Sequence, residues 1–129
     1  MQKIMSNYKN SLEIFVADKM SKIYKYARPT IASGATPVEK GDIKNPFFNI
    51  ECKQKRTSKA FTIPYKEWYK NCGEADTQYK DPVFVVENEL GERIAAMRLE
   101  NWFDLIYELM DLRKILEENN EKKDNESNM

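Results

Sequence analysis

Three residues between Gly41 and Lys53 are of types that could do chemistry together: Asp42, Glu51 and Lys53. Successive side chains of a strand point to opposite faces, so a strand over Phe47–Lys53 places Glu51 and Lys53 on one face. Two hard oxygen donors and a cation at a sheet edge suit a divalent-metal phosphodiesterase site. The opposite face of this strand carries core-type side chains: Phe48, Ile50 and Cys52.

Each of these residues also has a simpler interpretation. Glu51 and Lys53 could form a same-face ion pair on a solvated strand, a contact worth roughly 0.2–1 kcal/mol. Asp42 could be a turn residue, because aspartate favours turns. The combined spacing on an apolar strand favours the metal site over these separate explanations.

The chain contains no histidine. This absence excludes Ser-His-Asp and Cys-His nucleophiles, histidine zinc sites and histidine general bases. Any catalysis must therefore use carboxylates, lysine, hydroxyls and a metal.

The charge of the chain is unevenly distributed. Residues 1–99 carry 17 basic and 12 acidic side chains, a net charge of +5, whereas residues 100–129 carry 4 and 9, a net charge of −5. A basic field around an acidic centre favours a site that faces phosphates, although a solvated surface remains the alternative. The basic residues interpreted as DNA contacts are Lys40, Lys44, Lys55, Arg56 and Lys59.

Length and composition predict one domain over residues 1–118, followed by a disordered acidic tail over 119–129. The sequence has no apolar run of membrane-spanning length and no secretory signal pattern. Two cysteines do not make a disulfide framework, so free thiols and a cytoplasmic location are expected. No small-molecule cofactor is expected.

The periodicity of apolar residues predicts an α/β fold with a mixed central β-sheet of about five strands flanked by α-helices. Pro64 and Gly73 are expected to begin and end the second helix. The expected helices cover about 8–24, 64–72 and 101–116, and the expected strands cover about 41–43, 47–54, 60–63, 83–87 and 93–99.

The order of these motifs resembles that of PD-(D/E)XK nucleases, and small archaeal and phage Holliday-junction-resolvase-like endonucleases are the most similar group. The resemblance covers roughly residues 8–110 and implies a restriction-endonuclease-like fold. The chain departs from the pattern in having Gly-Asp where the family motif has Pro-Asp. The matching residues are Glu13, Ser33-Gly34, Gly41-Asp42 and Glu51-Cys52-Lys53.

The resemblance implies that Asp42, Glu51 and the backbone carbonyl of Cys52 bind Mg²⁺ or Mn²⁺. Lys53 is then expected to orient or deprotonate the attacking water, or to stabilise the charged phosphorane. Glu13 is expected to reach the metal or its water, the alternative being a capping box with Asn10 as N-cap.

Ser33 is expected to contact a phosphate or the metal-bound water, and an ST-turn is equally compatible with its position. Three aromatic residues of the middle helix, Tyr65, Trp68 and Tyr69, favour core packing or a dimer interface over base stacking.

The expected function is a metal-dependent DNA endonuclease that resolves Holliday junctions. Two symmetric cuts across a four-way junction need two active sites, which predicts a homodimer. The alternatives are a related nuclease of other specificity, such as a nickase, flap or restriction-type enzyme, and a catalytically inactive nuclease-fold module that binds DNA or protein.

Overall fold

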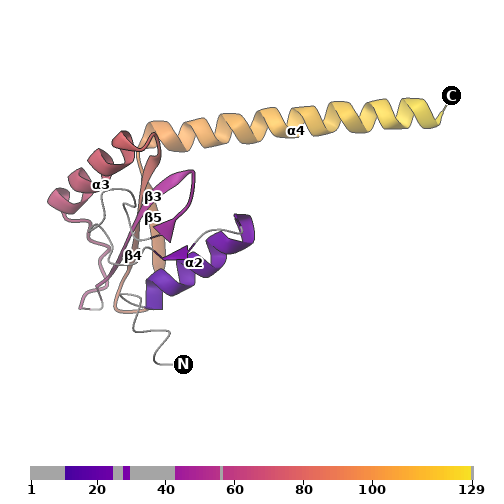
Figure 1. Cartoon of the computed structure of the whole chain (residues 1–129). Helices are drawn as coiled ribbons and strands as arrows, with labels where there is room; N and C mark the ends of the chain where they lie inside the picture. The colour runs from indigo at the N-terminus through magenta and orange to yellow at the C-terminus, as the bar shows by residue number, and fades with distance from the viewer. Residues whose placement is uncertain (1–10, 25–27, 30–42, 56, 129) are drawn as a thin grey trace. The chain divides into compact units, whose positions relative to one another are not determined.

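The computed structural model describes residues 11–24, 28–29, 43–55 and 57–128. The chain divides into two compact units, Met1–Met97 and Arg98–Met129. In chain order, the elements shown in Figure 1 are α2 (Ser11–Ile23), β1 (Arg28–Pro29), β2 (Ile43–Lys44), β3 (Phe48–Gln54), α3 (Tyr65–Thr77), β4 (Asp81–Glu87), β5 (Arg93–Met97) and α4 (Leu99–Ser127).

The sheet of the first unit is built around one parallel pair of strands. β3 and β4 run parallel over seven residues, from Phe48 opposite Asp81 to Gln54 opposite Glu87. Parallel neighbours need a crossover connection, and α3 provides it. β5 pairs antiparallel with β4, and the two-residue strands β1 and β2 continue the sheet beyond β3 in the order β1-β2-β3-β4-β5.

This sheet corrects the expected architecture. The expected central sheet of about five strands is wrong, and with it the restriction-endonuclease-like architecture: in the described part of the chain only β3, β4 and β5 are longer than two residues. The segment 60–63 is not a strand. Strand length depends on neighbouring strands that share the ladder, which local periodicity does not reveal. The general α/β class is correct.

Two helices cover opposite faces of this sheet. The apolar core lies under α2, where Ala17 packs with Ile43 of β2 and Ile50 of β3. Phe48 and Cys52 pack against the same cluster, so this face of β3 is the core face that the strand alternation predicts. On the other face, Asn49 is hydrogen-bonded to Asn71 of α3.

Helix α3 begins where the sequence predicts and ends later. Pro64 is its N-cap residue, but the helix passes through Gly73 and ends at Thr77. A glycine inside a helix costs about 1 kcal/mol relative to alanine. Asn71 and Ala75, on either side of Gly73, are buried, and the contacts of this turn with the sheet offset that cost.

The turn between β4 and β5 lies between the two strands that the sequence predicts over about 83–87 and 93–99. The Asn88 side-chain oxygen accepts hydrogen bonds from the backbone N–H groups of Leu90 and Glu92. Gly91 has a φ of 76°, a conformation that glycine adopts without steric cost. The hairpin therefore follows from local sequence.

The second unit consists of α4, and it extends beyond the predicted helix. Residues 119–127, where a disordered tail is expected, belong to this helix in the structure. Glutamate and lysine are strong helix formers, and Glu118 and Lys122 have the i,i+4 spacing that supports a helix. The single domain expected over residues 1–118 stays a prediction. None of the helices in the described ranges has the length and apolar character needed to span a membrane.

Candidate active site

The face of β3 opposite the core carries the two residues that the sequence singled out. Glu51 and Lys53 alternate with the core residues Ile50 and Cys52, and they lie on the side of the sheet that α3 covers. Phe84 stands opposite Glu51 in the parallel register and is buried. The strand alternation therefore places the carboxylate and the ammonium on one face.

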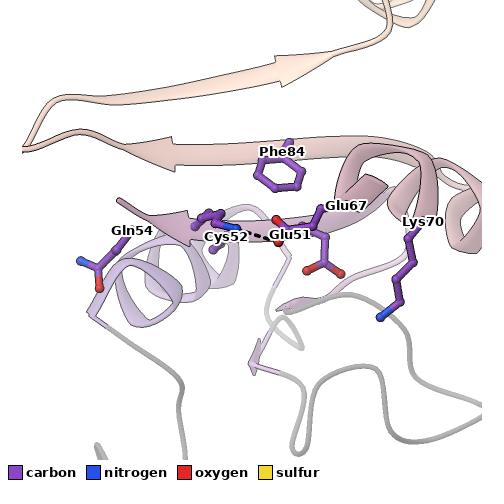
Figure 2. Close-up of a pocket in the computed structure, with 7 residues that line it drawn as sticks. Glu51, Cys52, Gln54, Glu67, Lys70 and Phe84 are labelled. Atoms are coloured by element: carbon purple, nitrogen blue, oxygen red, sulfur yellow. Dashed lines mark hydrogen bonds and ion pairs between the residues drawn. The ribbon is translucent and has the colours of Figure 1, made fainter. Parts of the chain in front are cut away.

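Both residues line a pocket of about 370 Å³ between β3, β4 and α3. Figure 2 shows this pocket with side chains from the sheet and from α3 around it. The pocket is more polar than apolar, since it contains two carboxylates and two ammonium groups. Its lining residues are Glu51, Cys52, Lys53, Gln54, Glu67, Lys70 and Phe84.

An ion pair across the pocket fixes the position of Lys53. Its Nζ lies 2.6 Å from Oε1 of Glu67, which belongs to the first turn of α3. The side chains of Lys53 and Glu67 are 32% and 47% exposed, so solvent screens the attraction and the pair adds little stability. The consequence is positional: Glu67 holds the ammonium group of Lys53 within the pocket.

Glu67 belongs to a polar stripe on α3 that sequence reasoning missed. The stripe recurs at helical spacing and consists of Glu67, Lys70, Asn71 and Glu74, followed by the C-cap residue Gln78. Helix residues three and four apart share one face, so a polar stripe at this spacing next to a strand is the signal that could have located the pocket.

Buried amides connect this stripe to the sheet. Asn49 Nδ2 donates to Asn71 Oδ1 at 2.6 Å and to Glu74 Oε2 at 3.3 Å. Asn71 Nδ2 in turn donates to the backbone carbonyl of Val83. Because a buried amide without partners would be costly, this network fixes where α3 lies on β3 and β4.

The carboxylate oxygens in the pocket are the type of ligand that a hard cation prefers. Glu51 and Glu67 supply carboxylate oxygens, the ligands that Mg²⁺ and Mn²⁺ favour. In the described part of the chain, no group of three or more histidine, cysteine or acidic side chains is arranged to hold a metal. Asp42, the other expected ligand, lies outside the described residues. The next residue, Ile43, pairs with Ile50, the neighbour of Glu51.

Glu13 is not part of this pocket. Its side chain is buried, and it belongs to α2, the helix that covers the opposite face of the sheet. The structure therefore does not bring Glu13 together with Glu51 and Lys53. Local sequence could not indicate which face of the sheet α2 covers.

The expected DNA contacts are only partly visible. Lys59 is exposed and Lys55 is half-buried. Lys44 belongs to β2, and the position of its side chain is not described. The remaining expected contacts, Lys40 and Arg56, lie outside the described residues, as does the expected catalytic residue Ser33.

The aromatic residues of α3 do not form a core. Tyr65 and Tyr69 are mostly exposed, with ring centroids 6.1 Å apart, which excludes core packing for both and leaves the dimer interface as a prediction. Trp68 is half-buried and lines a smaller, mostly apolar hollow of about 280 Å³ with Ile63, Tyr65, Ala96 and Met97.

Comparison with protein-family models, with curated proteins and with solved structures yields no match, so the resemblance to PD-(D/E)XK nucleases stays a prediction.

Proposed function

We propose that this chain is a metal-dependent DNA endonuclease that cuts branched DNA in the manner of a Holliday junction resolvase. The observation that carries the proposal is the pocket in which Glu51 and Lys53 lie on one face of β3, with Lys53 held by Glu67. The pairing of Ile43 with Ile50 supports Asp42 as the second acidic residue, because Asp42 precedes Ile43 directly.

The residues divide the work of phosphodiester hydrolysis. Glu51 and Asp42, with the carbonyl of Cys52, would hold Mg²⁺ or Mn²⁺ through oxygen atoms. The chemistry that such a metal would supply is that of a Lewis acid, which lowers the pKa of water and neutralises charge on the scissile phosphate. Lys53 orients the attacking water or stabilises the negative charge on the phosphorane oxygens, and Glu67 keeps its ammonium group in place.

DNA is the proposed partner of this face. The net charge of +5 over residues 1–99 attracts a phosphate backbone, and Lys55 and Lys59 lie within five residues of the end of β3. Symmetric cleavage of a junction requires two copies of the site, so the active form is a homodimer. Since its substrate is intracellular DNA, we place the protein in the cytoplasm.

The experiment that tests the proposal offers the purified chain a mobile four-way junction, a linear duplex and a single strand, each with Mg²⁺ and with EDTA. Paired symmetric nicks in the junction that require Mg²⁺ support a resolvase. Cleavage of the linear duplex instead supports a nuclease of other specificity. If no substrate is cut with Mg²⁺ or Mn²⁺, the endonuclease assignment fails.

Two matched controls separate the site from general damage to the fold. Glu89→Gln removes an exposed carboxylate from the turn between β4 and β5, and Lys66→Ala removes an exposed ammonium from α3 outside the pocket lining. Both variants should cut as fast as the parent chain. A loss of cleavage in either control would show that the assay reports on net charge and not on the pocket.

A further inference from the structure

Helix α4 presents a continuous apolar surface that no part of its own unit covers. None of its 29 residues is buried. Isolated helices depend on packing of an apolar face for most of their stability, and large exposed apolar patches mark interaction surfaces. The helix therefore needs a partner surface along this face.

The spacing of the apolar residues indicates the kind of helix packing that this surface suits. Alternating intervals of three and four residues form a single seam on one side of the helix, which is the a/d pattern of a coiled coil. The side chains of the seam are each more than a third exposed. They are Trp102, Leu105, Leu109, Leu112 and Leu116.

A neighbouring seam of the same helix is less suitable. A register through Ile106 and Leu109 brings Arg113 into the core, where a charged group is costly. The register through Leu105 and Leu112 is apolar from Trp102 to Leu116 and places Arg113 at the flanking e position. The seam therefore has one favoured register.

Charge complementarity identifies a second copy of this chain as the partner. In the favoured register Glu108 is at position g and Arg113 at the following e position, and both side chains are exposed. In a parallel, in-register pair of helices, a g residue lies beside the e residue five positions later on the other helix. Glu108 of each copy then lies beside Arg113 of the other, and the two-fold axis makes the contact twice.

We propose that α4 is a dimerisation helix, which pairs with α4 of a second copy as a parallel two-stranded coiled coil over Trp102–Leu116. Beyond Leu116 the helix has no apolar residue before Met129, so the seam ends there. The acidic residues Asp104 and Asp111 occupy the outer c positions and stay in solvent. The pairing does not depend on the chemistry of the pocket in the first unit.

The first test measures the mass of the full chain in solution by sedimentation equilibrium over a range of concentrations. The parent chain should be a dimer in equilibrium with its monomer. The double substitution Leu109→Lys with Leu112→Lys should raise the dimer dissociation constant by at least about 100-fold, because two seam positions in each chain lose their burial. Circular dichroism on the same samples verifies that the β-sheet signal of the first unit is retained, while the helical signal of α4 falls as its partner is lost.

The matched control places the same two charges on the outer face. Asp104→Lys with Asp111→Lys should leave a dimer, because position c does not enter the seam. A parent chain that is monomeric at every concentration, or that forms trimers, would overturn the proposal. So would a Leu109→Lys, Leu112→Lys variant that remains as dimeric as the parent chain.

The second test addresses the parallel register. Arg113→Glu alone and Glu108→Arg alone should each weaken the dimer roughly three- to tenfold, because each places like charges in contact twice. Mixing the two variants restores both opposite-charge contacts, so the mixture should form a heterodimer tighter than either variant alone. A mixture that associates no better than its components would rule out the parallel register.

Discussion

At the scale of single residues, the contact between Lys53 and Glu67 matters for orientation more than for stability. Both side chains are partly exposed, and ion pairs of this kind contribute about 0–1 kcal/mol. A lysine that is held by a carboxylate has fewer positions open to it than a free one. The value of the contact thus lies in where it places the ammonium group.

We expect Glu51→Gln and Lys53→Ala to abolish Mg²⁺-dependent cleavage while each changes the free energy of unfolding by less than about 1 kcal/mol. The reason is that neither side chain lies on the core face of β3. Cleavage rates and urea unfolding of the same preparations measure the two effects. Loss of folding in both variants would contradict the assignment of these residues to the site.

Glu67→Gln should lower kcat about tenfold and leave KM nearly unchanged, because the group that orients Lys53 is lost while the DNA contacts remain. Steady-state kinetics on the junction separate the two constants. Glu67→Asp, which keeps the charge on a shorter side chain, should recover part of kcat. Equal kcat for the parent chain and Glu67→Gln would show that the ion pair has no part in the reaction.

At the scale of elements, the turn between β2 and β3 depends on one buried side chain. Asn45 donates from Nδ2 to the carbonyl oxygens of Ile43 and Phe48, and its Oδ1 accepts from the N–H groups of Phe47 and Phe48. These four bonds fix the start of the strand that carries Glu51 and Lys53. The pocket therefore depends on a residue outside its lining.

Asn45→Ala should lower the free energy of unfolding by about 2–4 kcal/mol, because several buried backbone groups lose their partners at once. Asn45→Asp is the matched variant, since it keeps both acceptor contacts and loses both donors, and its effect should be smaller. Chemical denaturation measures both. One net hydrogen bond contributes about 1 kcal/mol to the free energy of unfolding. If Asn45→Ala lowers that free energy by less than this amount, the backbone groups of the turn have found other hydrogen-bond partners.

Substitution of two glycines by alanine should change the stability of the chain in opposite directions. Gly73 lies inside α3 with nothing within 4 Å of an added Cβ, so Gly73→Ala should stabilise the chain by about 0.5–1 kcal/mol. Gly91 has a φ of 76°, so Gly91→Ala should destabilise it by about 1 kcal/mol. Thermal unfolding of both variants tests the pair. A destabilised Gly73→Ala variant would contradict the open environment of that position.

At the scale of the whole molecule, the first 99 residues and the last 30 residues carry opposite net charge. The positive excess lies in residues 1–99 and the negative excess in residues 100–129. If charge were evenly distributed, removing any lysine would weaken DNA binding to the same extent. Because the charge is unevenly distributed, the loss of DNA affinity should depend on which lysine is removed.

Lys55→Glu combined with Lys59→Glu should weaken DNA binding and reduce the dependence of log K on log salt by about two contacts, roughly 0.9 each on duplex arms. Lys122→Glu combined with Lys123→Glu makes the same change in net charge on α4 and should leave binding nearly unaltered. Fluorescence anisotropy at several salt concentrations measures the slopes. Equal losses of DNA affinity in the two double variants would show that binding depends on net charge alone.

Sequence alone determined the features that depend on neighbours along the chain. Strand alternation placed Glu51 and Lys53 on one face, Pro64 marked the start of α3, and the two strands expected over 83–87 and 93–99 located the hairpin. These features follow from side-chain direction and from the φ values that each residue allows.

Only the tertiary structure decided the features that depend on partners distant in sequence. It reduced the five expected strands to three of substantial length, placed Glu13 under the opposite face of the sheet, and brought Glu67 to Lys53 across fourteen residues. The physical reason is that burial is shared between segments, and periodicity shows that a side chain is covered without showing what covers it.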